Sequence, residues 1–114
     1  KLGEMSMSRT ITPNDLKPLL ARDKDVVLLD IRRKNDYDAD PVKVPGAAWY
    51  DPNQVAEWSA QLPRDKDTVL YCVRGGSVSN AVVDALRALG INARFIEGGI
   101  EGWKQAGEPT VAKA

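Results

Sequence analysis

Short apolar runs alternate with segments of helical periodicity along most of this 114-residue chain. Mostly apolar runs at residues 26–29, 68–71 and 93–96 have the length of buried strands. The uninterrupted run at 26–29 is typical of a strand covered on both faces, as in a parallel sheet. Apolar positions three or four residues apart over 78–89 predict a helix with one buried face. Strands alternating with helices predict an α/β domain with a largely parallel sheet.

Local signals place the other expected elements. Thr12-Pro13 predicts a helix start, and the apolar stripe of that helix would consist of Leu16, Leu19 and Leu20. Pro18 should make this helix short or irregular. A second helix is expected over 53–62, a short strand over 47–49, and a short helix carrying Trp103 after residues 98–99. Gly90 is placed to end the helix over 78–89.

The charge balance gives no electrostatic argument for a polyanionic partner. Sixteen basic and sixteen acidic residues leave a formal net charge of zero, so we expect neither nucleic acid nor an anionic membrane as a partner. No apolar run approaches the roughly 20 residues of a membrane span. We expect an N-terminal stub or expression remnant at 1–8, one domain at 9–108 and a C-terminal tail at 109–114. The expected location is cytoplasmic, or periplasmic if a signal peptide has been removed.

A single cysteine and the lack of histidine exclude several enzyme classes. Without histidine there is no Ser-His-Asp triad, no Cys-His pair and no imidazole metal ligand. One cysteine forms no internal disulfide and builds no cysteine-based metal cluster alone. We therefore expect no metal and no cofactor.

Cys72 stands where a predicted strand ends and a predicted helix begins. Ligands of open α/β sheets bind at this carboxyl edge, and a helix N-terminus presents unpaired N–H groups with a partial positive charge. Gly75 and Gly76 allow successive amides to converge on an anion. Such a site lowers the pKa of a thiol without an imidazole. Taken alone, a cysteine at a strand end is most often a small buried apolar residue without chemistry; the combination with the short glycine loop, Arg74 and the helix start favours an anion-binding nucleophile.

Two other side chains of this segment have competing interpretations. Arg74 either binds the anionic end of a substrate or is a solvent-exposed residue that aids solubility. Ser77 is expected to be the N-cap of the following helix rather than a catalytic hydroxyl.

Several motifs in order make the chain resemble the rhodanese family of single-domain sulfurtransferases over about residues 11–103. These motifs are Leu29-Asp30-Ile31-Arg32, Asp36-Tyr37, Val44-Pro45-Gly46-Ala47, the six-residue loop 72–77, and Glu97-Gly98-Gly99-Ile100 followed by Trp103. The resemblance implies a rhodanese-like α/β fold at residues 9–108, with a central, mostly parallel five-stranded sheet and helices on both faces.

The resemblance also implies sulfur transfer through a persulfide on Cys72. The donor would be thiosulfate or a similar small anion, and the acceptor cyanide or a thiol. The implied substrate-binding loop consists of Val73, Arg74, Gly75, Gly76, Ser77 and Val78. Asp30 and Arg32 are expected to brace neighbouring loops through an ion pair or hydrogen bonds.

Three other functions compete with this one. A persulfide carrier would deliver sulfur to a dedicated protein partner, and a non-catalytic rhodanese-like regulatory module would act through protein contacts alone. A cysteine phosphatase or arsenate reductase on the same fold would need arginine where this chain has Val78, so that function is disfavoured.

Overall fold

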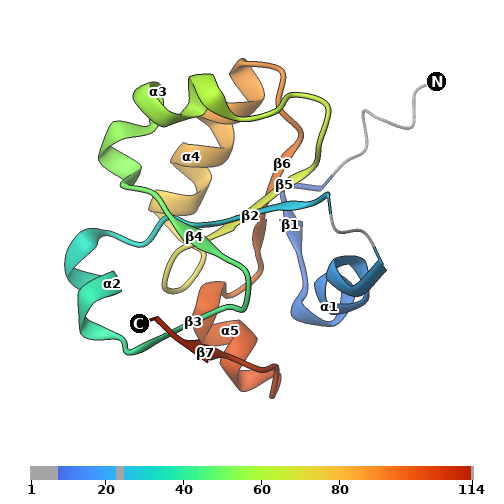
Figure 1. Ribbon diagram of the computed structural model, residues 1–114, viewed down its shortest axis with the longest axis vertical. Helices are drawn as coiled ribbons and strands as arrows, with labels where there is room; N and C mark the ends of the chain where they lie inside the picture. Colours follow the sequence, from blue (N-terminus) through green and yellow to red (C-terminus); the bar gives the residue numbers. More distant parts are fainter. Residues whose placement is uncertain (1–7, 23–24, 114) are drawn as a thin grey trace.

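The computed structural model of the chain describes residues 8–22 and 25–113, and its centre is a five-stranded sheet (Figure 1). The strands lie in the order β1 (Thr10–Ile11), β6 (Ala93–Ile96), β5 (Thr68–Tyr71), β2 (Val27–Asp30) and β4 (Ala48–Trp49). Every neighbouring pair in this sheet is parallel. The predicted fold class is confirmed, and the strand predicted over 47–49 is the edge strand β4.

Helices cover both faces of the sheet (Figure 1). On one face lie α1 (Pro13–Arg22) and α5 (Gly99–Gln105), whose apolar side chains share a core with Val69 and Tyr71 of β5. On the other face lie α4 (Ser77–Ala88) and α3 (Val55–Trp58). The central strand β5 is thus buried along its whole length, and packing on both faces fixes the position of its carboxyl end.

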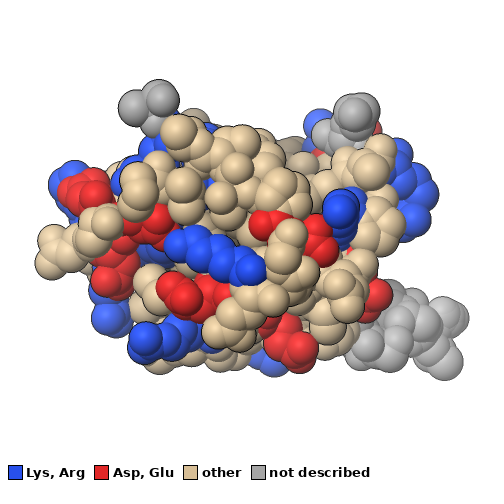
Figure 2. All heavy atoms as spheres, turned by 90° about the horizontal axis from the view of Figure 1, so that it is seen from below, with Lys and Arg blue, Asp and Glu red and all other residues tan. Residues whose placement is uncertain are grey.

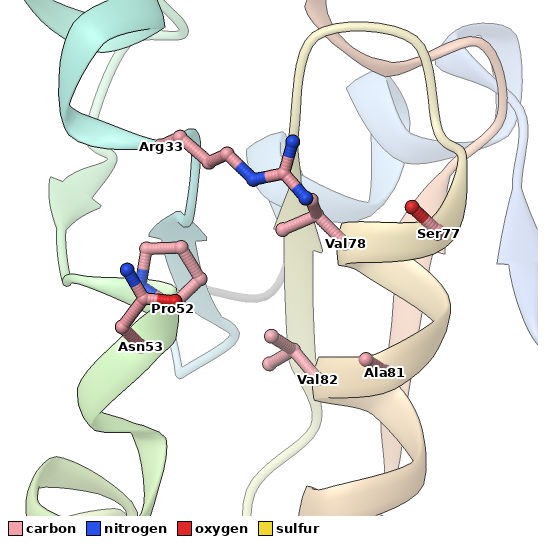
Figure 3. A pocket seen from close by; sticks show the side chains of 7 residues that line it. All are labelled: Arg33, Pro52, Asn53, Ser77, Val78, Ala81 and Val82. Atoms are coloured by element: carbon pink, nitrogen blue, oxygen red, sulfur yellow. The ribbon is translucent and has the colours of Figure 1, made fainter.

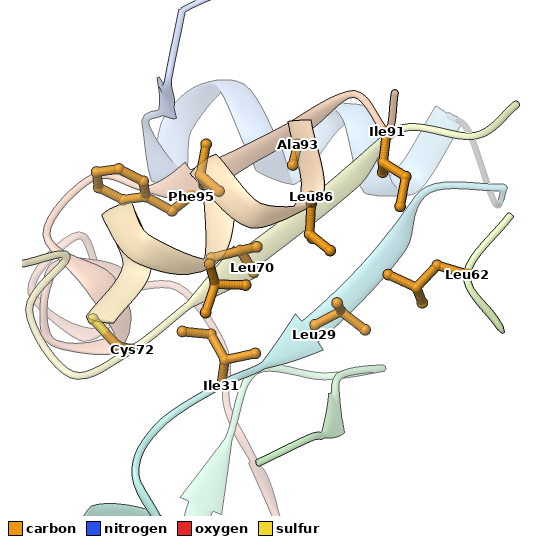
Figure 4. Close-up of a cluster of buried hydrophobic side chains, with 11 residues drawn as sticks. Leu29, Ile31, Leu62, Leu70, Cys72, Leu86, Ile91, Ala93 and Phe95 are labelled. Atoms are coloured by element: carbon orange, nitrogen blue, oxygen red, sulfur yellow. The ribbon is translucent and has the colours of Figure 1, made fainter. Parts of the chain in front are cut away.

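The core beneath α4 ends at the thiol (Figure 4). Leu70 of β5 and Leu86 of α4 are fully buried in this cluster, and Cys72 closes it at the carboxyl edge of the sheet. Removing a buried leucine from such a core costs about 2–5 kcal/mol of stability. The same packing that stabilises the fold therefore fixes the backbone on both sides of Cys72.

The segment predicted as a helix over 53–62 is helical, but the type of helix changes along it. The segment forms a 3-10 turn at Pro52–Gln54, one α-turn at Val55–Trp58 and another 3-10 turn at Ser59–Gln61. Hydrogen bonds between residues three apart tighten both ends, where the Gln54 amide donates to Asp51 and the Leu62 amide to Ser59. Leu62 is buried in the core beneath α4, and Val55 and Trp58 pack against the same core.

Some elements have no counterpart in the sequence-based prediction. Helix α2 (Lys34–Ala39) contains no buried residue, so no apolar periodicity marked it. The short strands β3 (Val42–Lys43) and β7 (Val111–Ala112) pair in an antiparallel sheet, which joins the C-terminal segment to the domain. Within the described part of the chain, no helix is long and apolar enough to cross a membrane. Basic and acidic side chains are interspersed on the face shown in Figure 2.

Candidate active site

Cys72 directly follows β5, at the carboxyl edge of the parallel sheet. Its neighbour Tyr71 pairs in register with Asp30 at the end of β2, so the two strand ends bring their loops to the same edge. The cysteine is 7% exposed, and a hollow of about 290 Å³ opens above it. The geometry therefore combines a protected thiol with access for a small molecule.

Hydrogen-bond donors converge on the Cys72 sulfur. The Ser79 hydroxyl lies 2.9 Å from Sγ and donates to it. Burial opposes ionisation of the thiol, but the Ser79 hydroxyl and the backbone amides of Gly76, Gly75 and Ser79 outweigh it and lower the pKa of Cys72. The loop thus activates the thiol with neutral donors at a helix N-terminus, without an imidazole.

The predicted N-cap role of Ser77 is wrong. Helix α4 begins at Ser77 itself, Gly76 occupies the N-cap position, and no side chain caps the helix. The amide of Ser79, the third residue of the helix, is directed at the Cys72 sulfur instead. An amide at this position normally donates to the side-chain oxygen of the N-cap residue. Here the Cys72 sulfur takes the place of that oxygen.

Sequence reasoning missed Ser79 as a donor to the thiol. Gly75 and Gly76, which were expected to let amides converge on an anion, donate to the Cys72 sulfur together with the amide of Ser79. Ser79 is fully buried. The signal that could have identified it is the helix start. If the helix begins at Ser77, its third residue is Ser79, and the amide at that position faces the N-terminal turn.

The first turn of α5 holds the other side of the loop. The amides of Ile100 and Glu101 donate to the carbonyl oxygens of Cys72 and Val73, at 3.0 and 3.1 Å. Gly99 permits this approach, since it has a φ of +63° and a Cβ on it would lie 2.4 Å from the Val73 oxygen. These hydrogen bonds hold the carbonyls of Cys72 and Val73 toward α5. The amides of Gly75 and Gly76, later in the loop, face the sulfur.

The expected ion pair between Asp30 and Arg32 forms at the carboxyl end of β2. Nη2 of Arg32 lies 2.7 Å from Oδ2 of Asp30, and both side chains are almost completely buried. Arg32 also donates to Asp40 at 3.0 Å and to the Val42 carbonyl at 3.1 Å, while the Tyr71 hydroxyl donates to Asp30. Burial opposes the charge of Arg32, but the hydrogen bond and charge of Asp30 raise its pKa above the usual value. The network ties the end of β2 to β5 and to the segment before β3.

Two arginines line the hollow above the thiol. Arg74 of the loop is exposed, and it forms no hydrogen bond or ion pair with another described residue. Arg33, which was not among the predicted site residues, lines the same hollow from the carboxyl side of β2. Its position directly after Arg32, near the sheet edge that carries Cys72, is the sequence signal that could have identified it. Asp36 is the acidic residue of the lining.

No group of three or more cysteine, aspartate or glutamate side chains suited to a metal ion exists among residues 8–22 and 25–113. The groups around Cys72 are the thiol itself, the amides that donate to it and the two arginines of the hollow.

Replacing Ser79 with alanine is expected to raise the pKa of the Cys72 thiol, because the thiolate loses a hydrogen-bond donor. Below the wild-type pKa, alkylation by iodoacetamide should slow about tenfold, since a hydrogen bond to a charged group contributes about 1.5–3 kcal/mol. The two proteins should converge at high pH. Ser77→Ala is the matched control, because Ser77 is exposed and donates no hydrogen bond to the sulfur. Identical pH profiles for Ser79→Ala and wild type would refute this role.

Comparison with known proteins agrees with this geometry. A family model described as a rhodanese-like domain matches residues 12–106. The chain is 30% identical over 109 residues to the probable adenylyltransferase/sulfurtransferase MoeZ of Mycobacterium tuberculosis. The aligned residues are 94% of this chain and 27% of that protein. The crystal structure of a rhodanese-related protein from Thermoplasma volcanium superposes with a TM-score of 0.78 at 29% identity, covering 91% of this chain and 98% of that one.

A thiosulfate sulfurtransferase from Pseudomonas aeruginosa is also similar, with a TM-score of 0.77 and 27% identity over 93% of this chain and 20% of that one. The chain thus spans only part of the length of its sulfurtransferase relatives, and the similarity is to one domain of each. The family match and these relatives support a sulfurtransferase family. The chain belongs to the rhodanese-like domain family.

Proposed function

We propose that the chain transfers sulfane sulfur from thiosulfate, or a similar small anionic donor, to cyanide or a thiol through a persulfide on Cys72. The observation that carries this proposal is the convergence of the Ser79 hydroxyl and three backbone amides on one sulfur atom, which lowers the pKa of the thiol. The same donors suit the negative charge of a persulfide.

The chemistry needs no acid catalyst. The Cys72 thiolate attacks the outer sulfur of thiosulfate, the sulfur–sulfur bond of the donor breaks, and its electron pair leaves with sulfite. Cyanide or an acceptor thiolate then attacks the outer sulfur of the persulfide, and the electron pair returns to Cys72. Sulfite is a stable anion and leaves without protonation, so the missing histidine does not obstruct either step.

Arg74 has the position and the chemistry to receive the donor. It lines the hollow that contains Cys72, and its guanidinium has no partner among the described residues. Planar guanidinium donors match sulfonate oxygens. We therefore assign Arg74 to attraction of the anionic donor, and the Asp30–Arg32 pair to bracing the segments that it joins at this edge of the sheet.

Incubation with thiosulfate is expected to add one sulfur atom to the protein, measured by intact mass, and cyanide should remove it with formation of thiocyanate. Cys72→Ser should show neither effect, and because Cys72 is the only cysteine the adduct has one possible thiol. A wild-type protein that gains no sulfur from thiosulfate or other sulfane donors would refute the proposal. Loading followed by slow discharge to cyanide would instead identify a carrier with a protein partner.

A further inference from the structure

We propose that a second hollow beside the active-site loop binds the sulfur acceptor, and that this acceptor is a small thiol with a carboxylate on a short apolar chain. The inference rests on the proposed persulfide chemistry and names the substrate class of its second step. The hollow has a volume of about 270 Å³ and lies between the start of α4 and the segment before α3 (Figure 3). Its lining consists of Arg33, Pro52, Asn53, Ser77, Val78, Ala81 and Val82.

The second hollow adjoins the one above the thiol. Arg33, Ser77 and Val78 line both, so they form the boundary between the two. A molecule seated in the second hollow therefore has a short path to a sulfur atom carried on Cys72. The volume is near the lower end of small-molecule sites, which suits a small acceptor rather than a folded protein segment.

Arg33 determines the charge of the proposed acceptor. It is the one charged residue among the described side chains that line the hollow. Asp36 lines the neighbouring hollow but not this one. The side chain of Arg33 extends from the side of Pro52 and Asn53 toward Val78 at the start of α4 (Figure 3). No hydrogen bond or ion pair with another described residue occupies it. An unpaired, planar cation at this place favours a carboxylate, which it can bind through two parallel hydrogen bonds.

The apolar part of the lining favours an acceptor with an apolar chain between its thiol and its carboxylate. Pro52, Val78, Ala81 and Val82 present apolar surface, and Figure 3 shows them on both walls below the guanidinium. Apolar area removed from water contributes about 25 cal/mol per Å². A thiol whose carboxylate and sulfur are joined by methylene groups therefore gains more in this hollow than a purely polar thiol does.

The transfer step balances without a further reactant. The acceptor thiolate attacks the outer sulfur of the Cys72 persulfide, and the sulfur–sulfur bond of that persulfide breaks. The electron pair returns to the Cys72 sulfur, and the acceptor leaves as a persulfide. The carboxylate takes no part in bond making, so Arg33 acts by positioning the acceptor.

The test measures discharge separately from loading. Protein loaded with thiosulfate and freed of excess donor is mixed with 3-mercaptopropionate or with its neutral amide, and loss of the added sulfur is followed by rapid-quench intact mass. At low ionic strength Arg33→Gln should slow discharge to the carboxylate by about fivefold and to the amide by less than about twofold, the range expected for one exposed charge. Comparing variant with wild type for each acceptor cancels differences in thiol reactivity.

Two further variants sharpen the result. Ala81→Glu places an acidic group on the wall of the hollow and should also slow discharge to the carboxylate selectively. Arg22→Gln removes an exposed arginine from the end of α1, on the opposite face of the sheet, and should change neither rate. Equal effects of Arg33→Gln on both acceptors, or none, would overturn the inference. A wild-type protein that fails to load would refute the proposed function instead, and this is scored before any acceptor is added.

Discussion

Replacing Gly99 with alanine is expected to remove most of the sulfur-transfer activity and to destabilise the fold by at least about 3 kcal/mol. The new Cβ would lie 2.4 Å from the Val73 carbonyl oxygen and 2.6 Å from that of Cys72, so the backbone of the active-site loop must move. That movement breaks the two hydrogen bonds from the start of α5 and adds the cost of a positive φ on a residue with a side chain. Urea unfolding measures the stability, and iodoacetamide alkylation of Cys72 measures the loss of thiol activation.

Gly107→Ala separates close packing from backbone strain. Gly107 has a φ of +77°, but a Cβ there would meet no atom within 4 Å. It should therefore cost only about 1–2 kcal/mol and leave the reactivity of Cys72 unchanged. If the two glycine variants lose the same stability and keep the same alkylation rate, the contact of Gly99 with the loop has no role in the site.

Replacing Arg32 with methionine should lower the free energy of unfolding by about 3–5 kcal/mol, because the carboxylate of Asp30 remains buried without its cation. Methionine fills much of the same space, so the loss reports the charge rather than a cavity. The change also removes the hydrogen bonds to Asp40 and to the Val42 carbonyl. Chemical denaturation followed by tryptophan fluorescence measures the change.

A second substitution and a surface pair test the cause. Asp30→Asn combined with Arg32→Met should recover part of the loss, because no unpaired charge is left in the interior. Lys34→Met breaks an exposed pair with Asp38 and should change stability by less than about 0.5 kcal/mol. A double variant less stable than Arg32→Met alone would show that hydrogen bonding, and not the buried charge, determines the contribution of this pair.

Local signals predicted the largest helix and every strand of the central sheet except β1, whose two residues are too short a run to stand out. The runs at 68–71 and 93–96 became β5 and β6, and the helical spacing after Cys72 became α4, because each buries the apolar residues that the pattern displays. Helix α2 has no buried residue, and β3 and β7 pair across most of the chain length. Neither leaves a periodic signal in one short window.

The position of the site could be predicted from the sequence, but the side chains that surround the thiol could not. Cys72 and its glycine loop follow from a strand, a turn and a helix that are adjacent in the sequence. The Ser79 hydroxyl and the Arg33 guanidinium reach the site through the helix start and a neighbouring strand end. Ser79 faces the thiol only because α4 begins at Ser77, one residue earlier than the pattern predicts. Arg33 lies near it only because β2 is the neighbour of β5, and the sequence pattern does not specify the order of strands.

The only cysteine of the chain is buried at the base of an open hollow. Under the proposed chemistry, no second thiol within the chain can resolve the persulfide, so each sulfur atom leaves only through an encounter with another molecule. The residence time of the bound sulfur then varies inversely with the concentration of acceptor. A loaded chain acts as a reservoir whose rate of emptying is determined by the supply of acceptor in its surroundings.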